Sequence, residues 1–253
     1  MMGKWKNCAL LVVLLTTNGW LQAEDAPEKT AEKILAAKES ADRPDEDRAR
    51  DANRRPTRTL MFFELSDQER VLELFPGSGW YTRILSDVLA ERGQLYVALA
   101  TSRISKMADE LQPVQILETG TRLIPTDSYG VYDLDSVDLG VESLDLIVTF
   151  RNLHNLTPAA RAKLLAAAYS ALRPGGRLGV VDHTRRHMEP DGVENRRRLD
   201  PLRVVLEATQ AGFTFAGYSD LHYRSDDELE YEVGARSVAG NTDRFTILFA
   251  RPE

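Results

Sequence analysis

The sequence predicts an α/β fold, in which helices cover both faces of a doubly wound, mostly parallel β-sheet. Short apolar segments rich in β-branched residues recur along the chain, and segments with helical periodicity separate them. Glycine and proline mark most of the junctions between the two kinds of segment. Strands that alternate with helices favour parallel pairing, because each helix returns the chain to the same end of the sheet. A chain of 253 residues is long enough for one such domain.

Residues 1–23 have the features of an export signal. Lys4 and Lys6 precede an apolar run at residues 8–17, and the segment that ends at Ala23 resembles a cleavage site. The apolar run is too short to span a bilayer. We therefore predict a periplasmic protein that starts after Ala23 and has no stable membrane association. The single cysteine lies in the apolar run, so its removal would exclude thiolate nucleophiles and thiolate metal sites.

Residues 24–63 are predicted to form a helical lead to the main domain at residues 64–253. Up to residue 53 the lead is polar, rich in alanine and charged with both signs, which favours one or two amphipathic helices. Its last four residues, 60–63, are apolar and should dock a short helix beside the first strand.

The first strand of the sheet leads into a glycine-containing turn. Residues 71–75 are mostly apolar, Gly77 and Gly79 follow, and the pattern then becomes helical. Glycine allows both a tight bend and the close approach of a ligand, and a helix start attracts anions. Glu73 is a carboxylate in an apolar strand and requires a partner. This stretch predicts a nucleotide-type cofactor loop; the alternative is a tight strand–helix connection without a ligand.

The rest of the chain alternates between strands and helices. Further strands are predicted at residues 94–100, 131–133, 144–150, 177–181, 213–218 and 244–250, and further helices at residues 104–111, 158–172 and 201–211. Thr157-Pro158 and Asp200-Pro201 each combine an N-cap residue with a proline suited to the first helical position. Gly212 should end the last helix.

Charge patterning argues against a nucleic-acid partner. The formal net charge is −7, whereas nucleic-acid-binding surfaces are basic. The one local basic run, residues 196–198, is predicted to be a solvated loop.

Candidate functional residues directly follow the strands, because ligands of doubly wound sheets bind beyond the carboxyl ends of the strands, where the strand order reverses. His154 and His183 follow strands that should be neighbours, and histidine is the side chain best suited to proton transfer near neutral pH. Either histidine could instead be structural. A metal site formed by these histidines and Asp182 has no recognised ligand spacing, so no metal is predicted.

Three segments together resemble a known family. ELFPGSGWYT (73–82), TFRNLHN (149–155) and ALRPGGRLGVVDH (171–183) are similar to the class I S-adenosylmethionine-dependent methyltransferases. The resemblance is closest to a bacterial, often exported branch that combines a PGxGWYT loop with an FRNxHN segment. It implies a Rossmann-like sheet of seven strands whose last strand is antiparallel, S-adenosyl-L-methionine as cofactor, and methyl transfer to a small-molecule acceptor.

The resemblance also implies residue roles. The candidate cofactor-binding residues are Glu73, Gly77, Ser78, Gly79, Trp80, Tyr81, Thr101, Asp133 and Arg151. Among these, the two glycines would lie against the methionine part and Asp133 would face the adenine. His154, Asn152 and His183 are the candidate catalytic residues, with His154 as general base and Asn152 orienting the acceptor or the cofactor amine.

One departure from the family pattern leaves alternatives open. The second strand lacks the usual acidic residue at its end, so Thr101 or Ser102 would have to contact the ribose. An inactive cofactor-binding protein of the same fold is one alternative. An NADP-dependent oxidoreductase is a weaker one. Thr101-Ser102-Arg103 would suit its 2′-phosphate, but Thr82 occupies the place of the third glycine of GxGxxG and no Tyr-x-x-x-Lys pair follows. The sequence leaves the acceptor and the oligomeric state open.

Overall fold

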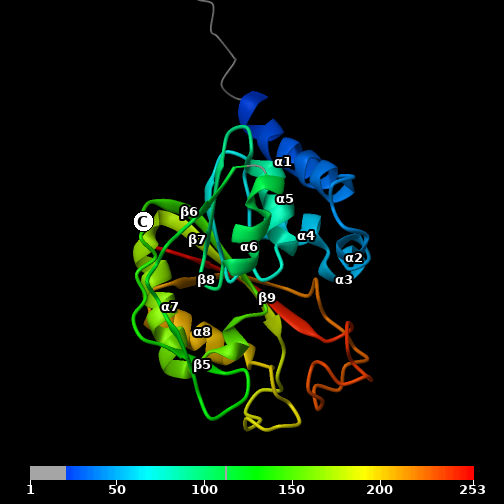
Figure 1. Ribbon diagram of the computed structural model, residues 1–253, viewed down its shortest axis with the longest axis vertical. Coiled ribbons are helices and arrows are strands. Elements are labelled where there is room, and N and C mark those ends of the chain that lie inside the picture. The colour runs from blue at the N-terminus through cyan, green and yellow to red at the C-terminus, as the bar shows by residue number, and fades with distance from the viewer. Residues whose placement is uncertain (1–20, 112) are drawn as a thin grey trace, which may run out of the picture.

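The computed structural model describes residues 21–111 and 113–253, and its central feature is a seven-stranded sheet (Figure 1). The predicted export signal lies almost entirely outside the described residues. The sheet has the order β3-β2-β1-β6-β7-β9-β8. Its strands are β1 (Arg70–Leu74), β2 (Gln94–Ala98), β3 (Val114–Ile116), β6 (Leu144–Phe150), β7 (Leu172–His183), β8 (Thr214–Ser219) and β9 (Arg244–Ala250). The first five strands in this order pair in parallel, and β9 is antiparallel to both of its neighbours. The predicted fold class is confirmed.

Helices cover both faces of the sheet. They are α1 (Leu21–Glu39), α2 (Asp45–Arg48), α3 (Asp51–Arg54), α4 (Pro56–Phe62), α5 (Trp80–Leu89), α6 (Ser102–Met107), α7 (Pro158–Ala171) and α8 (Pro201–Gln210), with 3₁₀ turns η1 (Ala108–Glu110) and η2 (Leu153–Asn155). One apolar cluster joins α1, α4 and α5 to the sheet, and a second joins α7 and α8 to the opposite face (Figure 1). No helix among the described residues combines the length and apolar character that a membrane span requires.

Alternation along the central strands builds these two clusters. In β1, Val71 packs into the cluster under α5, whereas Leu72 and Leu74 pack into the cluster under α7. In β6, Leu146 and Val148 face the first cluster. Successive side chains of a strand point to opposite faces, so a strand that is buried on both faces must be apolar throughout.

The predicted helix starts are confirmed. The Thr157 side chain accepts a hydrogen bond from the backbone N–H of Ala160 at 3.1 Å, and Asp200 accepts one from Leu202 at 2.9 Å. Each cap satisfies a backbone donor that the first helical turn leaves without a partner. Gly212 follows α8 with φ at 106° and marks its end.

The third strand differs from the prediction. The third parallel strand is β3, whereas the predicted strand at 131–133 corresponds to β5 (Tyr132–Leu134). β5 lies outside the main sheet and pairs with β4 (Leu123–Pro125) in a separate antiparallel hairpin. β3 is a short, partly exposed edge strand and therefore lacks a continuous apolar run. Asp133 consequently does not follow the third strand of the sheet.

Phe63, directly after α4, packs closely against β7 at Gly179. A Cβ atom added at Gly179 would lie 2.6 Å from ring atoms of Phe63. Gly179→Ala should therefore lower the free energy of unfolding by about 1–3 kcal/mol, the usual cost of overpacking a core. Urea denaturation measures this, with Gly217→Ala in β8 as control, since its Cβ would meet Phe62 at an ordinary 3.5 Å. Equal stability of the two variants would contradict the packing described.

Candidate functional site

The strand order reverses between β1 and β6, and strained backbone gathers at the carboxyl ends of these strands. From β1 the chain proceeds to β2 and β3 on one side, and from β6 to β7 on the other. Residues other than glycine adopt positive φ directly after three strands: Phe75 at 53°, Leu99 at 67° and Arg151 at 65°. Such conformations cost free energy and concentrate at functional sites. This edge is where a ligand of a doubly wound sheet is expected.

The glycine loop lines a cavity of about 120 Å³ at this edge. Its lining residues are Arg50, Arg54, Glu73, Phe75, Pro76, Gly77, Ser78, Trp80, Tyr81, Phe150, Arg151 and Asn152. Gly77 has φ at 61°, and a Cβ there would meet no atom within 4 Å, so the backbone faces open space. Gly79 differs from the expectation of ligand contact. Its φ is 81°, and a Cβ would lie 3.0 Å from Ile104 and 3.2 Å from Met107, so this glycine lets α6 pack against the turn.

Glu73 is a buried acid in the wall of the small cavity. Only 3% of the residue is exposed, and the hydroxyl of Thr82 donates a hydrogen bond to one carboxylate oxygen at 2.6 Å. Burial raises the pKa of Glu73 to about 8, despite the opposing influence of Thr82 and Arg54. Among the described residues no cation forms an ion pair with it. A buried carboxyl group in this state suits a cationic ligand group.

Trp80 and Tyr81 anchor the N-terminal helices to the site. The indole N–H of Trp80 donates to the carbonyl oxygen of Asp47 at 2.9 Å, and the hydroxyl of Tyr81 donates to the carbonyl oxygen of Arg54 at 3.2 Å. Tyr81 stacks on Phe150 with ring centroids 3.5 Å apart. Through these two hydrogen bonds, Trp80 and Tyr81 hold α2 and α3 at the carboxyl edge of the sheet.

A larger cavity of about 430 Å³ lies beside the first and shares Arg50, Arg54 and Arg151 with it. Its full lining is Arg50, Asn53, Arg54, Arg151, His154, Asn155, His183, Arg197, Val233, Gly234, Gly240, Thr242 and Arg244. β9 begins at this edge because it runs antiparallel to its neighbours, so Arg244 and Thr242 reach the same cavity as the ends of β6 and β7.

His154 and Asp182 form a hydrogen-bonded pair in the wall of the larger cavity. His154 Nδ1 lies 2.5 Å from Asp182 Oδ1, and the backbone N–H of His154 donates to Oδ2 at 3.2 Å. The side chains are 4% and 0% exposed. A proton on Nδ1 satisfies the carboxylate and leaves Nε2 as a free acceptor. The pair can therefore take up a proton from a bound molecule.

His183 has a different environment. Its ring lies 5.5 Å from that of His154, and its Nδ1 is 2.8 Å from the hydroxyl of Thr242. Burial, followed by the nearby His154 and Arg151, holds the pKa of His183 well below its ordinary value. His183 is thus neutral near pH 7.

The side chain of Asn152 joins the ends of two neighbouring strands. The Asn152 amide donates to Thr149 Oγ1 at 3.1 Å and to the carbonyl oxygens of Leu74 and Phe75 at 3.4 and 3.3 Å, which ties β6 to β1. Its side chain is therefore held in place by the strand ends.

Three candidate cofactor-binding residues, Gly79, Thr101 and Asp133, line neither cavity. Thr101 precedes α6, and its carbonyl oxygen accepts the backbone N–H of Ser105 at 3.0 Å. Asp133 bonds the backbone N–H of Leu134 at 2.7 Å and lies 3.5 Å from Lys163 in α7. Within residues 21–111 and 113–253, no group of three or more His, Cys, Asp or Glu residues is arranged to hold a metal ion.

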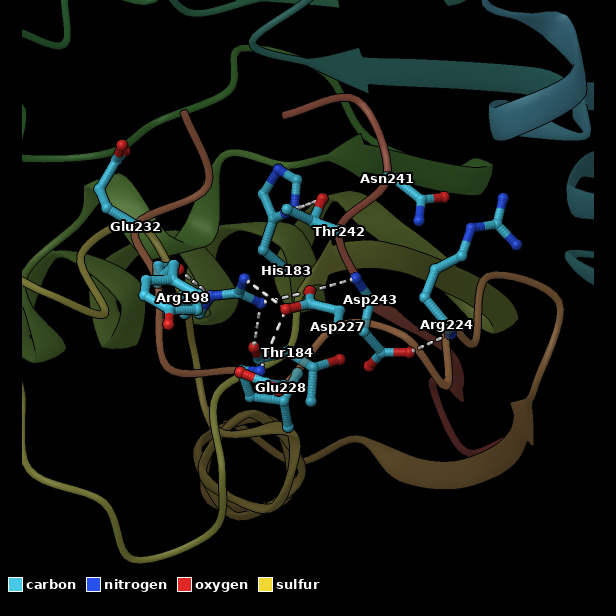
Figure 2. A network of polar contacts seen from close by, with 12 residues as sticks. His183, Thr184, Arg198, Arg224, Asp227, Glu228, Glu232, Asn241, Thr242 and Asp243 are labelled. Atoms are coloured by element: carbon cyan, nitrogen blue, oxygen red, sulfur yellow. Dashed lines mark hydrogen bonds and ion pairs between the residues drawn. The ribbon is translucent and has the colours of Figure 1, made fainter. Parts of the chain in front are cut away.

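The basic run at residues 196–198 is not the solvated loop that the sequence predicts. Arg198 forms a fully buried ion pair with Asp227 at 2.9 Å, and Asp227 also accepts the backbone N–H of Asp243 at 2.6 Å (Figure 2). Arg197 lines the larger cavity and pairs with Glu232. A charge run is usually solvated, and nothing local in the sequence indicates the distant acidic partners.

Known proteins resemble this chain in structure. No protein-family model and no curated protein matches the sequence. Three solved structures illustrate the likeness: an S-adenosylmethionine-dependent methyltransferase from Aquifex aeolicus (17% identity, TM-score 0.53, 87% of this chain and 98% of that chain), the [4+2]-cyclase SpnF (15%, 0.56, 88% and 93%), and human N-acetylserotonin methyltransferase in complex with S-adenosylmethionine (12%, 0.52, 94% and 61%). The cyclase among them illustrates that a shared fold does not assign a reaction. The chain has the fold of the S-adenosylmethionine-dependent methyltransferases.

Proposed function

We propose that the protein is a class I methyltransferase that transfers a methyl group from S-adenosyl-L-methionine to a small-molecule acceptor. The observation that carries this proposal is the His154–Asp182 pair at a cavity continuous in its lining with the glycine-loop cavity. In the fold of the methyltransferases, that arrangement combines a place for the cofactor with a base beside it.

The residues of the small cavity fit the amino-acid end of the cofactor. Glu73 is a buried carboxyl group without a cationic partner among the described residues and suits the amine. Arg54 and Arg151 line the same cavity and suit the carboxylate. Gly77 offers bare backbone with free space beside it. When bound, the cofactor would supply an activated methyl group on a sulfonium, whose sulfur would keep the electron pair of the carbon–sulfur bond and leave as a neutral thioether.

The chain's own contribution to the reaction is positioning and proton transfer. The oxygen or nitrogen of the acceptor's hydroxyl or amine would form a bond to the methyl carbon. The same group would lose its proton to His154 Nε2. Asp182 stabilises the resulting imidazolium and holds the ring in the tautomer that leaves Nε2 free. The walls of the cavity would hold the acceptor in line with the departing sulfur, and such positioning accounts for much of the acceleration in displacements of this kind.

Two features weigh against the alternatives. Thr101 and Arg103, which would hold a 2′-phosphate in an NADP-dependent oxidoreductase, line neither cavity. An inactive binding protein has no need of a buried carboxylate that orients a histidine toward a cavity.

Binding of S-adenosylhomocysteine should strengthen as the pH rises from about 6 to about 8. The pKa of Glu73 is raised to about 8, and only its ionised form pairs with the ligand's ammonium group. The affinity should therefore rise by up to about tenfold per pH unit below that pKa. Without ligand, the free energy of unfolding has the opposite pH dependence. Because the folded-state pKa of Glu73 is raised, its protonated form favours the folded protein, and this contribution is lost as the pH rises through about 8. Calorimetric titration in buffers of different ionisation enthalpy measures both the affinity and the proton released.

The matched variant is Glu73→Gln, which keeps the shape of the side chain and cannot ionise. It should bind S-adenosylhomocysteine weakly and without the pH dependence. NADP, titrated in parallel, should not bind. Tight NADP binding, or affinity for S-adenosylhomocysteine that is independent of pH in the wild type, would contradict the role assigned to the small cavity.

We also propose membership of the exported bacterial branch with the PGxGWYT loop and FRNxHN segment. Support comes from the two motifs, most of whose residues line the two cavities, and from the signal-like residues 1–23. On this proposal the mature protein is periplasmic, residues 24–63 are its helical lead, and residues 64–253 are its methyltransferase domain. The lead contributes directly to the site through Arg50 and Arg54.

A further inference from the structure

The larger cavity is strongly cationic although the protein is acidic. Five arginines line it, and no aspartate or glutamate is among its lining residues in the described part of the chain. The whole chain carries a formal charge of −7. A cleft lined by one sign of charge concentrates ligands of the opposite sign. The larger cavity is therefore positively charged in a protein whose net charge is negative.

The central arginines of this cavity lack carboxylate partners. Arg197 is paired with Glu232, but Arg54, Arg151 and Arg244 form no ion pair with any carboxylate of the described residues. Arg54 and Arg244 are each only 6% exposed. Arg244 donates one hydrogen bond, to the carbonyl oxygen of Asn53 at 2.6 Å, and its Nε has no partner.

Arg54 is held firmly in place. Its carbonyl oxygen accepts hydrogen bonds from Thr59, Tyr81 and His222 at 3.1, 3.2 and 3.0 Å. Its guanidinium lies over the ring of Trp80, 4.4 Å from the centroid. Because both the backbone and the guanidinium of Arg54 are held in place, the side chain is preorganised for a bidentate contact with an anion.

An unpaired, buried guanidinium is costly in the free protein. Burial is the first cause that lowers the pKa of Arg54 to about 9 and that of Arg244 to about 10, and the charge of Arg151 contributes to both. The positive charges of neighbouring arginines repel one another, and the loss of hydration adds to the free-energy cost. Packing alone does not require such a cluster, whereas an anionic ligand would relieve both penalties.

We propose that the methyl acceptor carries an oxyanion, a carboxylate or a phosphate, that binds Arg244 together with the N–H groups of Arg54 and Arg151 that the cofactor's carboxylate leaves free, and so places the acceptor's nucleophile at His154. This rests on the proposed methyltransferase function. The cofactor's own carboxylate does not account for the cluster, because Arg244 lines only the larger cavity, whereas Arg54 and Arg151 line both. Arginine binds either oxyanion with two parallel hydrogen bonds.

The test is calorimetric titration of the full chain with malonate, inorganic phosphate and the neutral malonamide, at constant ionic strength. Malonate or phosphate should bind, the tighter of the two identifying the acceptor's anion, and malonamide should not. Arg244→Gln should weaken the binding at least tenfold, and Arg244→Lys should weaken it less. Arg58→Gln is the matched control, since Arg58 is exposed on α4 and lines neither cavity. Its affinity should equal that of the wild type.

Parallel titration with S-adenosylhomocysteine separates the two proposals. Arg244→Gln should keep its affinity for S-adenosylhomocysteine, and the wild type should bind malonate equally well when saturated with it. If S-adenosylhomocysteine binds but neither anion does, the anionic acceptor is refuted and the methyltransferase proposal stands. If S-adenosylhomocysteine displaces the anion and Arg244→Gln weakens both, the arginines serve the cofactor, and the acceptor proposal is overturned. Anion binding without S-adenosylhomocysteine binding would instead refute the methyltransferase.

Discussion

His154→Ala should lower the single-turnover rate of methyl transfer by about 10²–10⁴-fold, the usual contribution of a general base. Among the described residues that line the larger cavity, only the His154 imidazole combines a free ring nitrogen with a hydrogen bond to a buried carboxylate. S-adenosylhomocysteine affinity should change little, because His154 does not line the glycine-loop cavity. The rate is measured as release of S-adenosylhomocysteine, after a screen of anionic small molecules has supplied an acceptor.

The loss must be separated from a loss of folded protein. Removal of the imidazole leaves the fully buried Asp182 without a side-chain partner, which costs about 1–3 kcal/mol. Melting temperature and rate are therefore measured on one preparation. Asp182→Asn tests the same pair with a smaller change in shape and should also lower the rate. His187→Ala is the control, since His187 is 56% exposed and lines neither cavity. A normal rate in His154→Ala would remove this residue from the mechanism.

Arg198→Met should destabilise the protein by about 3–5 kcal/mol, because it leaves Asp227 buried and uncompensated. Arg198 joins the segment after β7 to the loop between β8 and β9, which supplies Gly234 and Thr242 to the larger cavity. It also donates to the carbonyl oxygens of Thr184 and Tyr231 at 3.0 and 2.7 Å. Loss of this side chain should therefore disorder one wall of the site.

Urea denaturation measures the effect, with a double variant as reference. Arg198→Met combined with Asp227→Leu removes both charges and should recover part of the loss, since a buried pair contributes less than the penalty of an orphaned charge. Arg203→Met, at an exposed position of α8, should stay within about 0.5 kcal/mol of the wild type. An Arg198→Met variant as stable as Arg203→Met would show that the pair does not hold the wall.

Most of the sheet could be predicted because its signals are local. β6 is mostly apolar and almost fully buried, and α7 and α8 begin with a capping residue followed by proline. β3 could not be predicted in this way. It has three residues, is partly exposed, and obtains its place from pairing with β2 alone. The segment around Tyr132 resembles a strand of the sheet in sequence, since burial of Tyr132 and Leu134 under α7 produces the same pattern as burial in the sheet.

The site could be predicted only where strand ends indicate it. His154 follows β6, and the sequence places it correctly at the edge. Its pairing with Asp182 depends on the alignment of β6 with β7, which no local pattern specifies. Arg54 enters from a helix that precedes the sheet. Arg244 could have been foreseen, because an antiparallel last strand begins where the parallel strands end.

A crystal structure of the protein with S-adenosylhomocysteine tests the central claim most directly. We expect the ligand at the carboxyl edge between β1 and β6, against the backbone of Gly77. Its amine should lie at Glu73 and its carboxylate near Arg54 and Arg151. The sulfur should face the larger cavity that contains His154. A ligand bound elsewhere, or a glycine-loop cavity that stays empty at saturating ligand, would contradict the assignment of this edge as the cofactor site.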